Sequence, residues 1–322
     1  MKVLIVTSVF PNTRNPYSGL YVKEQIDSVK IKYPDVMFSV YFVDHGKGRT
    51  EYLKSIYKIN SLIKKNNYDI VHVHYGIAGM FLLNPFRVKI PTVVTFHGSD
   101  IQPKGGNGLL SELISKEVAK KADAVIVLNN SMQLMVDKYN KKSSIIPCAV
   151  NLNIFKRPEQ IINNKQPIIV FPSNRERGVK NYPLFCEVLT ILRNEYGINP
   201  IEKEVKNMSR SQVAELFSNS NLLLMTSKSE GSPQAIKEAM ACNLPCVSTP
   251  VGDVNVLLDG VRDSYVAKEH NAIELAALVN KSLLKKGNGI SGREKCVMLG
   301  IDSDSVADKI YCLYQNVIKT HK

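Results

Sequence analysis

The chain has 322 residues, of which 44% are hydrophobic and 22% are charged, and its formal net charge is +13. The length suits two domains of roughly 150 residues each, and the composition is that of a globular protein. No apolar run reaches the roughly 18 residues that a membrane-spanning helix needs, and the six cysteines are scattered in apolar runs, as in a reducing compartment. We therefore expect a cytoplasmic protein.

The positive charge is concentrated in the first half of the chain. Residues 1–150 carry 20 lysines and arginines against 11 acidic residues, which leaves +9 on this half and +4 on the remainder. Such an excess could attract nucleic acid, an anionic lipid surface or a phosphate-bearing substrate, or it could serve solubility alone. Nucleic acid is disfavoured because no aromatic residues are interleaved with the basic ones and no known binding motif is present.

In the first half, short runs of Val and Ile alternate with segments of helical period. Strands are predicted at 2–9, 38–44, 69–75, 91–97, 123–129 and 143–148, and helices at 20–33, 51–66 and 109–121. The alternation is typical of βα units that build a parallel sheet. The helix at 51–66 combines an apolar stripe with several lysines. Its periodicity favours core packing, and contact with an anionic membrane is the alternative.

The second half repeats the pattern after a polar, Asn-rich segment at 151–167. Strands are predicted at 167–173, 221–227 and 245–250, and helices at 183–195, 210–218, 233–242, 271–285 and 303–319. We therefore expect an α/β protein made of two domains, each with a doubly wound parallel sheet. In this fold class, ligands bind beyond the carboxyl ends of the strands.

The stretch TSKSEGSPQAIKEAMACNLPCVSTPVGD, residues 226–253, carries the strongest chemical signal. Glu230 follows a predicted strand, and Ser232 and Pro233 are predicted as the N-cap and the first residue of a helix. A helix N-terminus at this edge of a sheet favours a phosphate. Glu238 lies about 8 Å further along at 1.5 Å per residue. Two carboxylates so placed suit hydroxyl groups at the two ends of one ligand with phosphates between them, as in a nucleotide-sugar.

This stretch closely resembles the signature of the retaining glycosyltransferases of family 4, in which seven residues separate two glutamates. Asn243 stands where the family usually has glycine. Further landmarks of the family follow in the same order, namely FPNTRNPYSGLYVKEQ, DIVHVHYG, VVTFHGSD and FPSNRERGVKN. The resemblance therefore covers most of the chain.

The resemblance implies the GT-B architecture of two Rossmann-like domains. Residues 1–152 would bind the acceptor, residues 153–302 would bind the nucleotide-sugar, and a helix at 303–322 would cross back to the first domain. One departure concerns residues 197–208, where the family usually has an additional strand and helix. We therefore expect a smaller second sheet, and the shortened segment is one that often borders the nucleobase in the family.

The resemblance also implies roles for individual residues. Lys180 would hold the donor diphosphate with Arg175, by the family spacing, or with Arg177. Glu230 would bind the donor sugar, and His97 would lie beside it, so that His97, Glu230, Arg175 and Lys180 form the expected catalytic group. The other expected contacts are Glu238 with the ribose, His74 and Asp100 with the acceptor, and Gly19, Gly231, Ser232, Pro233 and Gln234 with the donor.

The implied reaction moves a sugar from a nucleotide diphosphate donor, expected to be a UDP-sugar, to an acceptor hydroxyl with retention and without a metal or other cofactor. The acceptor would be a growing capsule or surface glycan, or one linked to polyprenyl diphosphate, and the protein could contact the inner face of the membrane. A sugar-nucleotide epimerase or phosphorylase of the same fold and a non-catalytic glycan-binding protein are the alternatives. His72 and His74 share one side of a strand, but no further metal ligand is near in sequence, which favours a core or cleft-lining role.

Overall fold

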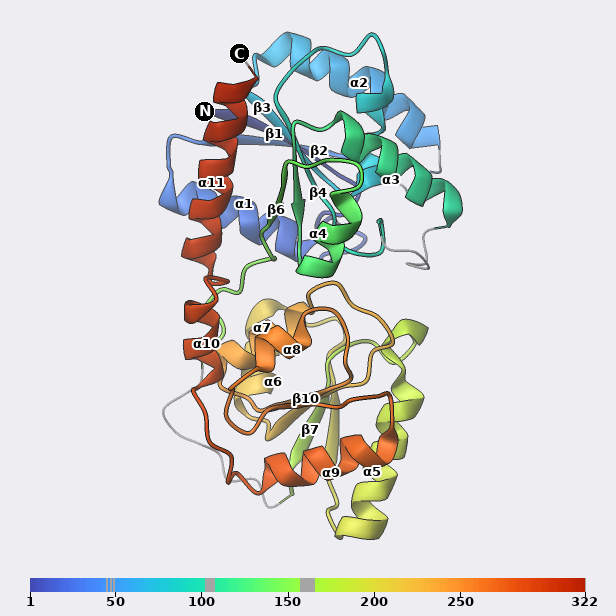
Figure 1. The fold of residues 1–322 in the computed structure, drawn as a ribbon, viewed down its shortest axis with the longest axis vertical. Coiled ribbons are helices and arrows are strands. Elements are labelled where there is room, and N and C mark those ends of the chain that lie inside the picture. Colours follow the sequence, from blue (N-terminus) through green and yellow to red (C-terminus); the bar gives the residue numbers. More distant parts are fainter. Residues whose placement is uncertain (45, 47, 49, 102–107, 157–165, 322) are drawn as a thin grey trace. The chain divides into compact units, whose positions relative to one another are not determined.

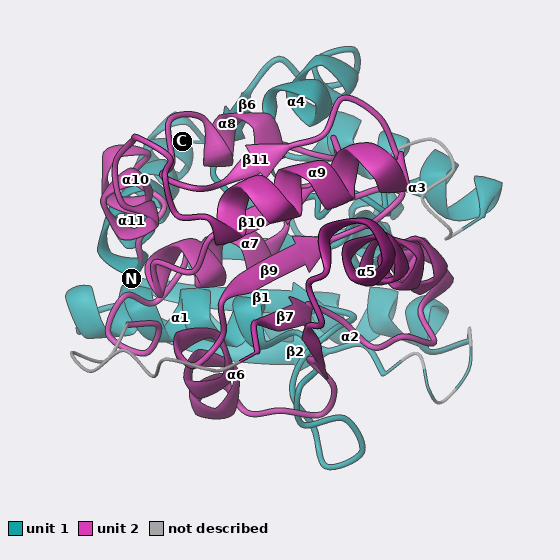
Figure 2. Cartoon of the chain, turned by 90° about the horizontal axis from the view of Figure 1, so that it is seen from below, with its two compact units in different colours: residues 1–149, 303–322 teal, residues 150–302 magenta. Residues whose placement is uncertain are grey.

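The structure is a computed structural model that describes residues 1–44, 46, 48, 50–101, 108–156 and 166–321. The chain forms two compact units (Figure 2). Unit 1 comprises residues 1–149 together with the C-terminal segment from residue 303, and unit 2 comprises residues 150–302. No helix in the described part of the chain combines the length and apolar character needed to cross a bilayer.

Unit 1 is built on a six-stranded parallel sheet with the order β2-β1-β3-β4-β5-β6. All six strands predicted in this half are present: β1 (Lys2–Thr7), β2 (Met37–Phe42), β3 (Ile70–His74), β4 (Thr92–Thr95), β5 (Ala124–Val127) and β6 (Ser143–Ile145). Strands β3, β4 and β5 are buried along their whole length. A parallel sheet covered on both faces requires such continuous burial, which explains the unbroken Val and Ile runs.

Helices cover both faces of this sheet (Figure 1). On one face, α1 (Leu20–Lys32) and α11 (Ser303–Thr320) share a core with β1, and Lys32 Nζ lies 2.6 Å from Asp308 Oδ2 of α11. The other face carries α2 (Thr50–Asn66), the 3-10 helix η2 (Gly76–Leu83), α3 (Leu109–Lys121) and α4 (Asn130–Val136). The predicted helices agree with these bounds to within one residue, whereas η2 and α4 were not predicted.

Unit 2 contains a five-stranded parallel sheet with the order β11-β10-β9-β7-β8. Its strands are β7 (Ile168–Phe171), β8 (Ile201–Glu204), β9 (Leu222–Met225), β10 (Cys246–Ser248) and β11 (Tyr265–Val266). Only β7, β9 and β10 were predicted. The edge strand β8 has the sequence IEKE and is largely exposed, so it lacks the apolar run of a buried strand. The short segment at 197–208 therefore still supplies a strand, although this sheet is one strand smaller than that of unit 1.

The helices of unit 2 also lie on both faces of their sheet. One face packs against α5 (Tyr182–Tyr196) and α9 (Ala272–Leu283), and the other packs against α6 (Arg210–Ser218), α7 (Gln234–Ala241), α8 (Val254–Leu258) and α10 (Gly292–Met298). The 3-10 helix η3 (Gly178–Lys180) precedes α5. Beyond α7, Asn243 has a φ of 53°, which is the left-handed conformation that favours glycine after a helix.

Candidate active site

The predicted site residues form one group in each compact unit. Gly19, His74, His97 and Asp100 lie in unit 1, and the other residues expected to contact the donor, from Arg175 to Glu238, lie in unit 2. Within each unit they follow the carboxyl ends of parallel strands, as ligand-binding residues of this fold class do.

In unit 1, the neighbouring strands β3 and β4 bring His74 and His97 together. The Nδ1 atom of His74 lies 3.1 Å from Nε2 of His97, and their ring centroids are 5.4 Å apart. The rings of Tyr21 and Tyr75 lie 5.0 Å and 4.6 Å from the His97 ring, and their two hydroxyls are hydrogen-bonded to each other. His97 is thus surrounded by three aromatic rings.

Neither tyrosine was predicted as a site residue. Tyr75 directly follows β3, and Tyr21 lies in the first turn of α1, so the sequence places each next to a predicted site residue without showing that they meet. Tyr75 has φ 72° and ψ 131°, a conformation that costs a residue with a side chain on the order of 1–3 kcal/mol. Strain of this kind concentrates at functional sites, which supports a role for Tyr75 beside His97.

Asp100 is the residue that orders the backbone around His97. Its carboxylate is 1% exposed and accepts hydrogen bonds from the backbone N–H groups of Gly76 (3.1 Å), His97 (2.9 Å) and Gly98 (3.1 Å). Burial raises the pKa of Asp100 to about 6, and the backbone hydrogen bonds oppose that rise. Asp100 therefore fastens the turn after β4 to the start of η2, and its direct contact with an acceptor stays a prediction.

The two histidines of β3 are both buried, and they differ in the hydrogen-bond partners of their ring nitrogens. The ring of His72 uses both nitrogens, with Nδ1 2.6 Å from the hydroxyl of Tyr314 and Nε2 2.7 Å from Oγ1 of Thr95. Burial holds the pKa of His72 well below its ordinary value and lowers the pKa of His74 to about 3. Among the described residues, no three side chains of metal-ligating type are grouped to hold an ion. His72 accordingly has the core role that the sequence favours.

Gly19 is the N-cap of α1 and has a φ of 65°. A Cβ atom at this position would lie 2.5 Å from the carbonyl oxygen of Val9. Both the left-handed backbone and the close approach require glycine. The first turn of α1, which carries Tyr21, is therefore seated directly on the segment that follows β1.

In unit 2, Lys180 and Glu230 form an ion pair. Lys180 ends η3 and Glu230 lies in the loop after β9, and Nζ of Lys180 is 2.5 Å from Oε1 of Glu230. Backbone ties hold the two segments together: Lys228 N–H donates to the Val179 carbonyl (2.8 Å), and the Thr226 hydroxyl donates to the Lys180 carbonyl (3.1 Å). The side chains are 17% and 15% exposed, so the pair stays accessible to a ligand.

The two candidate arginines differ sharply in their surroundings. Arg175 lies 2.6 Å from Oε1 of Glu202 and 3.1 Å from Oε2 of Glu204, both on β8, and its guanidinium is 4.9 Å from the ring centre of Tyr182. Arg177 is exposed, and the described part of the chain gives its guanidinium no ion pair or hydrogen bond. Arg175 is thus engaged by the protein, whereas Arg177 is available to an anion.

The first residues of α7 differ from the prediction made from the sequence. The helix begins at Gln234, and Pro233 is its N-cap with an extended backbone (φ −68°, ψ 115°). The hydroxyl of Ser232 has no hydrogen-bond partner among the described residues and does not cap the helix. The prediction of Ser232 as N-cap and Pro233 as first helical residue is therefore wrong, because the extended Pro233 separates the hydroxyl from the free amides of the first turn. The contacts of Gly231 to Gln234 with a donor stay predictions.

Glu238 is 4% exposed on α7 and meets an arginine that the sequence did not single out. Its Oε1 lies 2.5 Å from Nη1 of Arg210, whose guanidinium is also 5.7 Å from the ring centre of Phe155. Arg210 begins α6 directly after Ser209, which forms a capping box with Gln212. The Ser-x-x-Gln pattern predicts this helix start, but nothing local indicates which carboxylate Arg210 would meet.

Two family models match the chain. Residues 24–154 match the model described as Glycosyltransferase Family 4, and residues 166–285 match the model described as Glycosyl transferases group 1. The chain belongs to glycosyltransferase family 4. The resemblance carried by the stretch around Glu230 and Glu238 is thereby confirmed, and the two models together extend over most of this glycosyltransferase.

Individual relatives of this family 4 glycosyltransferase are distant. It is 24% identical over 307 residues to the N-acetyl-alpha-D-glucosaminyl L-malate synthase of Bacillus anthracis, which covers 82% of this chain and 79% of that protein. It is 26% identical over 313 residues to the UDP-Gal:alpha-D-GlcNAc-diphosphoundecaprenol alpha-1,3-galactosyltransferase of Escherichia coli, with 83% and 80% covered.

Solved structures show the same fold. The sucrose-phosphate synthase of Thermosynechococcus elongatus superposes with a TM-score of 0.80 at 16% identity, covering 99% of both chains. Together with the two parallel sheets of six and five strands, this likeness confirms the predicted GT-B fold with two Rossmann-like domains.

Proposed function

We propose that this glycosyltransferase moves a sugar from a UDP-sugar to an acceptor hydroxyl with retention at the anomeric carbon. The observation that carries the proposal is the accessible pair of Lys180 and Glu230 at the carboxyl edge of the unit 2 sheet. Lys180 can offset the negative charge that builds on the departing diphosphate, and the Glu230 carboxylate can accept hydrogen bonds from donor-sugar hydroxyls. On donor binding, the two side chains exchange their mutual contact for contacts with the ligand.

The contacts of Glu230 and Glu238 also support a mechanism in which the diphosphate leaves and the acceptor hydroxyl attacks on the same face of the sugar. Glu230 is held by Lys180 and Glu238 by Arg210, so neither carboxylate is arranged as a nucleophile. We propose that the departing diphosphate, bound by Lys180 and the amides at the start of α7, guides the acceptor hydroxyl to the face that it leaves. Glu238 would bind the ribose, and Arg210 would orient its carboxylate. Transfer without a metal stays a prediction of this mechanism.

The second cation of the diphosphate site is proposed to be Arg177. Its guanidinium is exposed and is not paired within the described part of the chain, whereas Arg175 is held by two carboxylates and a tyrosine ring. Arginine suits a diphosphate because its planar group can donate two parallel hydrogen bonds to phosphate oxygens. Arg175 then positions the segment that leads to Arg177 and Lys180.

The proposed acceptor is a sugar hydroxyl of a surface polysaccharide or glycolipid, carried in one form on polyprenyl diphosphate. Support comes from the Escherichia coli relative, whose printed name describes transfer from UDP-Gal to a diphosphoundecaprenol-linked sugar. In unit 1, the aromatic surroundings of His97 suit a sugar ring, and we propose that His97 lies beside the transferred sugar, with His74 and Asp100 shaping the acceptor side.

The test is release of UDP from a panel of UDP-sugars with saccharide acceptors. Glu230→Gln and Lys180→Met should each lower turnover at least about a hundredfold, because each removes transition-state stabilisation. Glu176→Gln and Lys206→Met are matched controls, since these residues form an exposed ion pair of the same unit with an N–O distance of 2.9 Å. Wild-type turnover in either site variant, or equal losses in the controls, would contradict the proposal.

A further inference from the structure

The loop that follows β10 lies directly against the loop that follows β9. The hydroxyl of Thr249 donates to a carbonyl of that loop at 2.8 Å. A Cβ atom on Gly252, which has a φ of 56°, would lie only 2.4 Å from the carbonyl oxygen of Gly231. The backbones of the two loops are therefore in contact at the carboxyl edge of the unit 2 sheet. This contact places Asp253, the next residue, beside the loop that carries Glu230.

The carboxylate of Asp253 has unused hydrogen-bonding capacity. Asp253 is the N-cap of α8 but makes no side-chain capping hydrogen bond. Its Oδ1 atom and the hydroxyl of the nearby Ser232 are buried, and neither has a hydrogen-bond partner among the described residues. Because buried polar atoms are normally paired, the two oxygens point to a hydrogen-bond donor that the described part of the chain does not supply. The Asp253 side chain is only partly buried, so a ligand can reach it.

A buried lysine favours the ionised form of this carboxylate. Lys237 on α7 is 0% exposed, and its positive charge acts on Asp253. Burial raises the pKa of Asp253, and the Lys237 ammonium and the Ser232 hydroxyl oppose that rise. Since Lys237 is enclosed and Asp253 is partly exposed, the negative group is the one that is accessible to a ligand.

We propose that Asp253 selects the sugar of the donor. Its carboxylate would accept hydrogen bonds from the hydroxyl or amide groups of a neutral sugar and would repel the carboxylate of a uronic acid. With Lys180 turned to the diphosphate, Glu230 and Asp253 place two negative groups beside the sugar and strengthen this selection. The inference rests on the proposed function, because it takes the ligand beside Glu230 to be a UDP-sugar. It narrows that donor to a UDP-sugar without a carboxylate.

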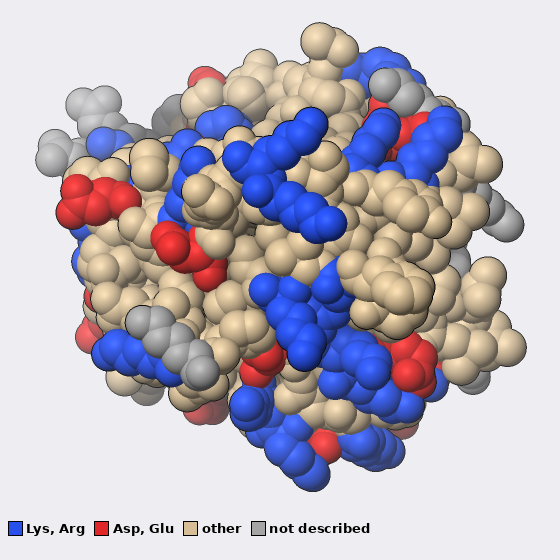
Figure 3. Space-filling view, turned by 90° about the horizontal axis from the view of Figure 1, so that it is seen from above, with Lys and Arg blue, Asp and Glu red and all other residues tan. Residues whose placement is uncertain are grey.

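The charge of the whole chain cannot produce this selection. The formal net charge is +13, and lysine and arginine side chains gather in patches on the face that Figure 3 shows. A field of this sign attracts a UDP-uronate, which carries the additional negative charge, more strongly than a UDP-hexose. A preference for the neutral sugar therefore requires a negative group close to the sugar, and the position of Asp253 meets that requirement.

The experiment measures the affinity of the full chain for UDP and for two matched pairs of donors at physiological ionic strength. UDP-glucose is compared with UDP-glucuronate, and UDP-galactose with UDP-galacturonate, because the members of each pair differ only in the carboxylate at C6. In calorimetric titrations, the neutral member of the more tightly bound pair should bind at least about tenfold more tightly than its uronate, since like charges close together repel.

Asp253→Asn tests the residue without changing its size. The variant should lower the preference for the neutral sugar at least about tenfold, because the amide removes the charge and can donate to a carboxylate. Its affinity for UDP alone should stay within about twofold of the wild type, because UDP lacks the group that Asp253 contacts. A purely structural role of Asp253 would instead weaken the binding of UDP as well.

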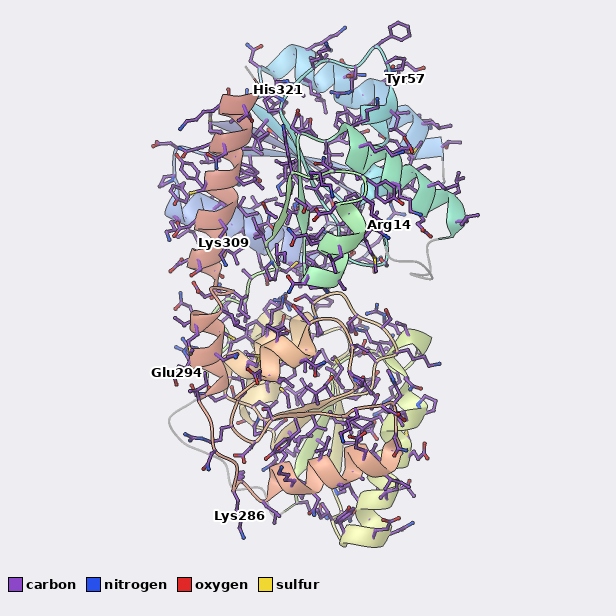
Figure 4. All side chains as sticks on the ribbon, in the orientation of Figure 1. Arg14, Tyr57, Lys286, Glu294, Lys309 and His321 are labelled. Atoms are coloured by element: carbon purple, nitrogen blue, oxygen red, sulfur yellow. The ribbon has the colours of Figure 1, made fainter. Side chains whose placement is uncertain are left out.

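The matched control is Glu294→Gln, which removes one carboxylate from the same unit. Glu294 is exposed on α10 and lies on the outer side of that helix in Figure 4. This variant should keep the wild-type preference. Equal affinity of the wild type for both members of the pair, an unchanged preference in Asp253→Asn, or loss of UDP affinity in that variant would overturn the inference. Failure of the wild type to bind UDP or any of the four donors would instead contradict the proposed function, on which the inference depends.

Discussion

At the scale of single residues, the carboxylates of the family signature each meet a cation from a distant part of the chain. Glu230 pairs with Lys180 and Glu238 pairs with Arg210. An unpaired carboxylate in such a partly buried setting would cost free energy, and the ion pair with the cation offsets that cost. The same reasoning separates Arg175 from Arg177, because two carboxylates of β8 already neutralise Arg175.

Substitution of the two arginines should therefore have different effects. Arg177→Gln should weaken UDP binding about tenfold and leave the free energy of unfolding unchanged, because it removes one charge-assisted contact with the diphosphate. Arg175→Gln should instead lower the free energy of unfolding by about 1 kcal/mol, a modest amount because Arg175 is 42% exposed. Calorimetric UDP titration and urea unfolding measure the two effects. A weaker UDP affinity in Arg175→Gln alone would reverse the assignment.

The buried histidines should make stability depend on pH. The pKa of His74 is lowered to about 3 in the folded chain from 6.5, so the unfolded chain takes up the proton first, and stability is lost as the pH falls below 6.5. The raised pKa of Asp100, about 6, acts in the opposite direction, because its protonation favours the folded chain at lower pH. His72 has a lowered pKa as well, so the histidines outweigh Asp100.

His74→Gln isolates this dependence. Between about pH 7 and about pH 5, the variant should lose roughly 1 kcal/mol less per pH unit than the wild type, since one titrating group is gone. Urea unfolding of both proteins at the two pH values measures the difference. Parallel pH profiles would show that His74 does not titrate as its burial requires.

At the scale of elements, glycine geometry decides where α1 begins and where α5 ends. Gly19 and Gly197 share a φ of 65°, but only Gly19 has a close neighbour, the Val9 carbonyl oxygen, 2.5 Å from an added Cβ. Gly197→Ala should cost about 1 kcal/mol of unfolding free energy for the left-handed backbone alone. Gly19→Ala should cost at least about 1 kcal/mol more, because α1 must move away from the segment after β1. Thermal unfolding of both variants measures the difference, and equal losses would show that the close approach carries no cost.

The same scale shows where prediction from the sequence succeeded and where it failed. A buried strand such as β5 is predicted by its unbroken apolar run, and α2 is predicted by its helical period. The edge strand β8 was missed because three of its four residues are charged and none of the four is buried. The start of α7 was placed one residue too early because Ser-Pro is a common helix start, and only the backbone at Pro233 shows that the helix begins later.

At the scale of the whole molecule, each unit has its own hydrophobic cores on the two faces of its sheet. The last helix, α11, belongs to unit 1, although all of unit 2 lies between the two parts of unit 1 in the sequence. Its buried residue Tyr314 forms a hydrogen bond through its hydroxyl with the ring of His72.

The sequence by itself determined the alternation of strands and helices and the family, since these depend on local periodicity and on contiguous motifs. Only the tertiary structure decided which cation meets which carboxylate and which rings surround His97. The physical reason is that periodicity reports which side of an element is buried, whereas partners depend on strand order. By placing β8 beside β7, the sheet brings Glu202 and Glu204 to Arg175.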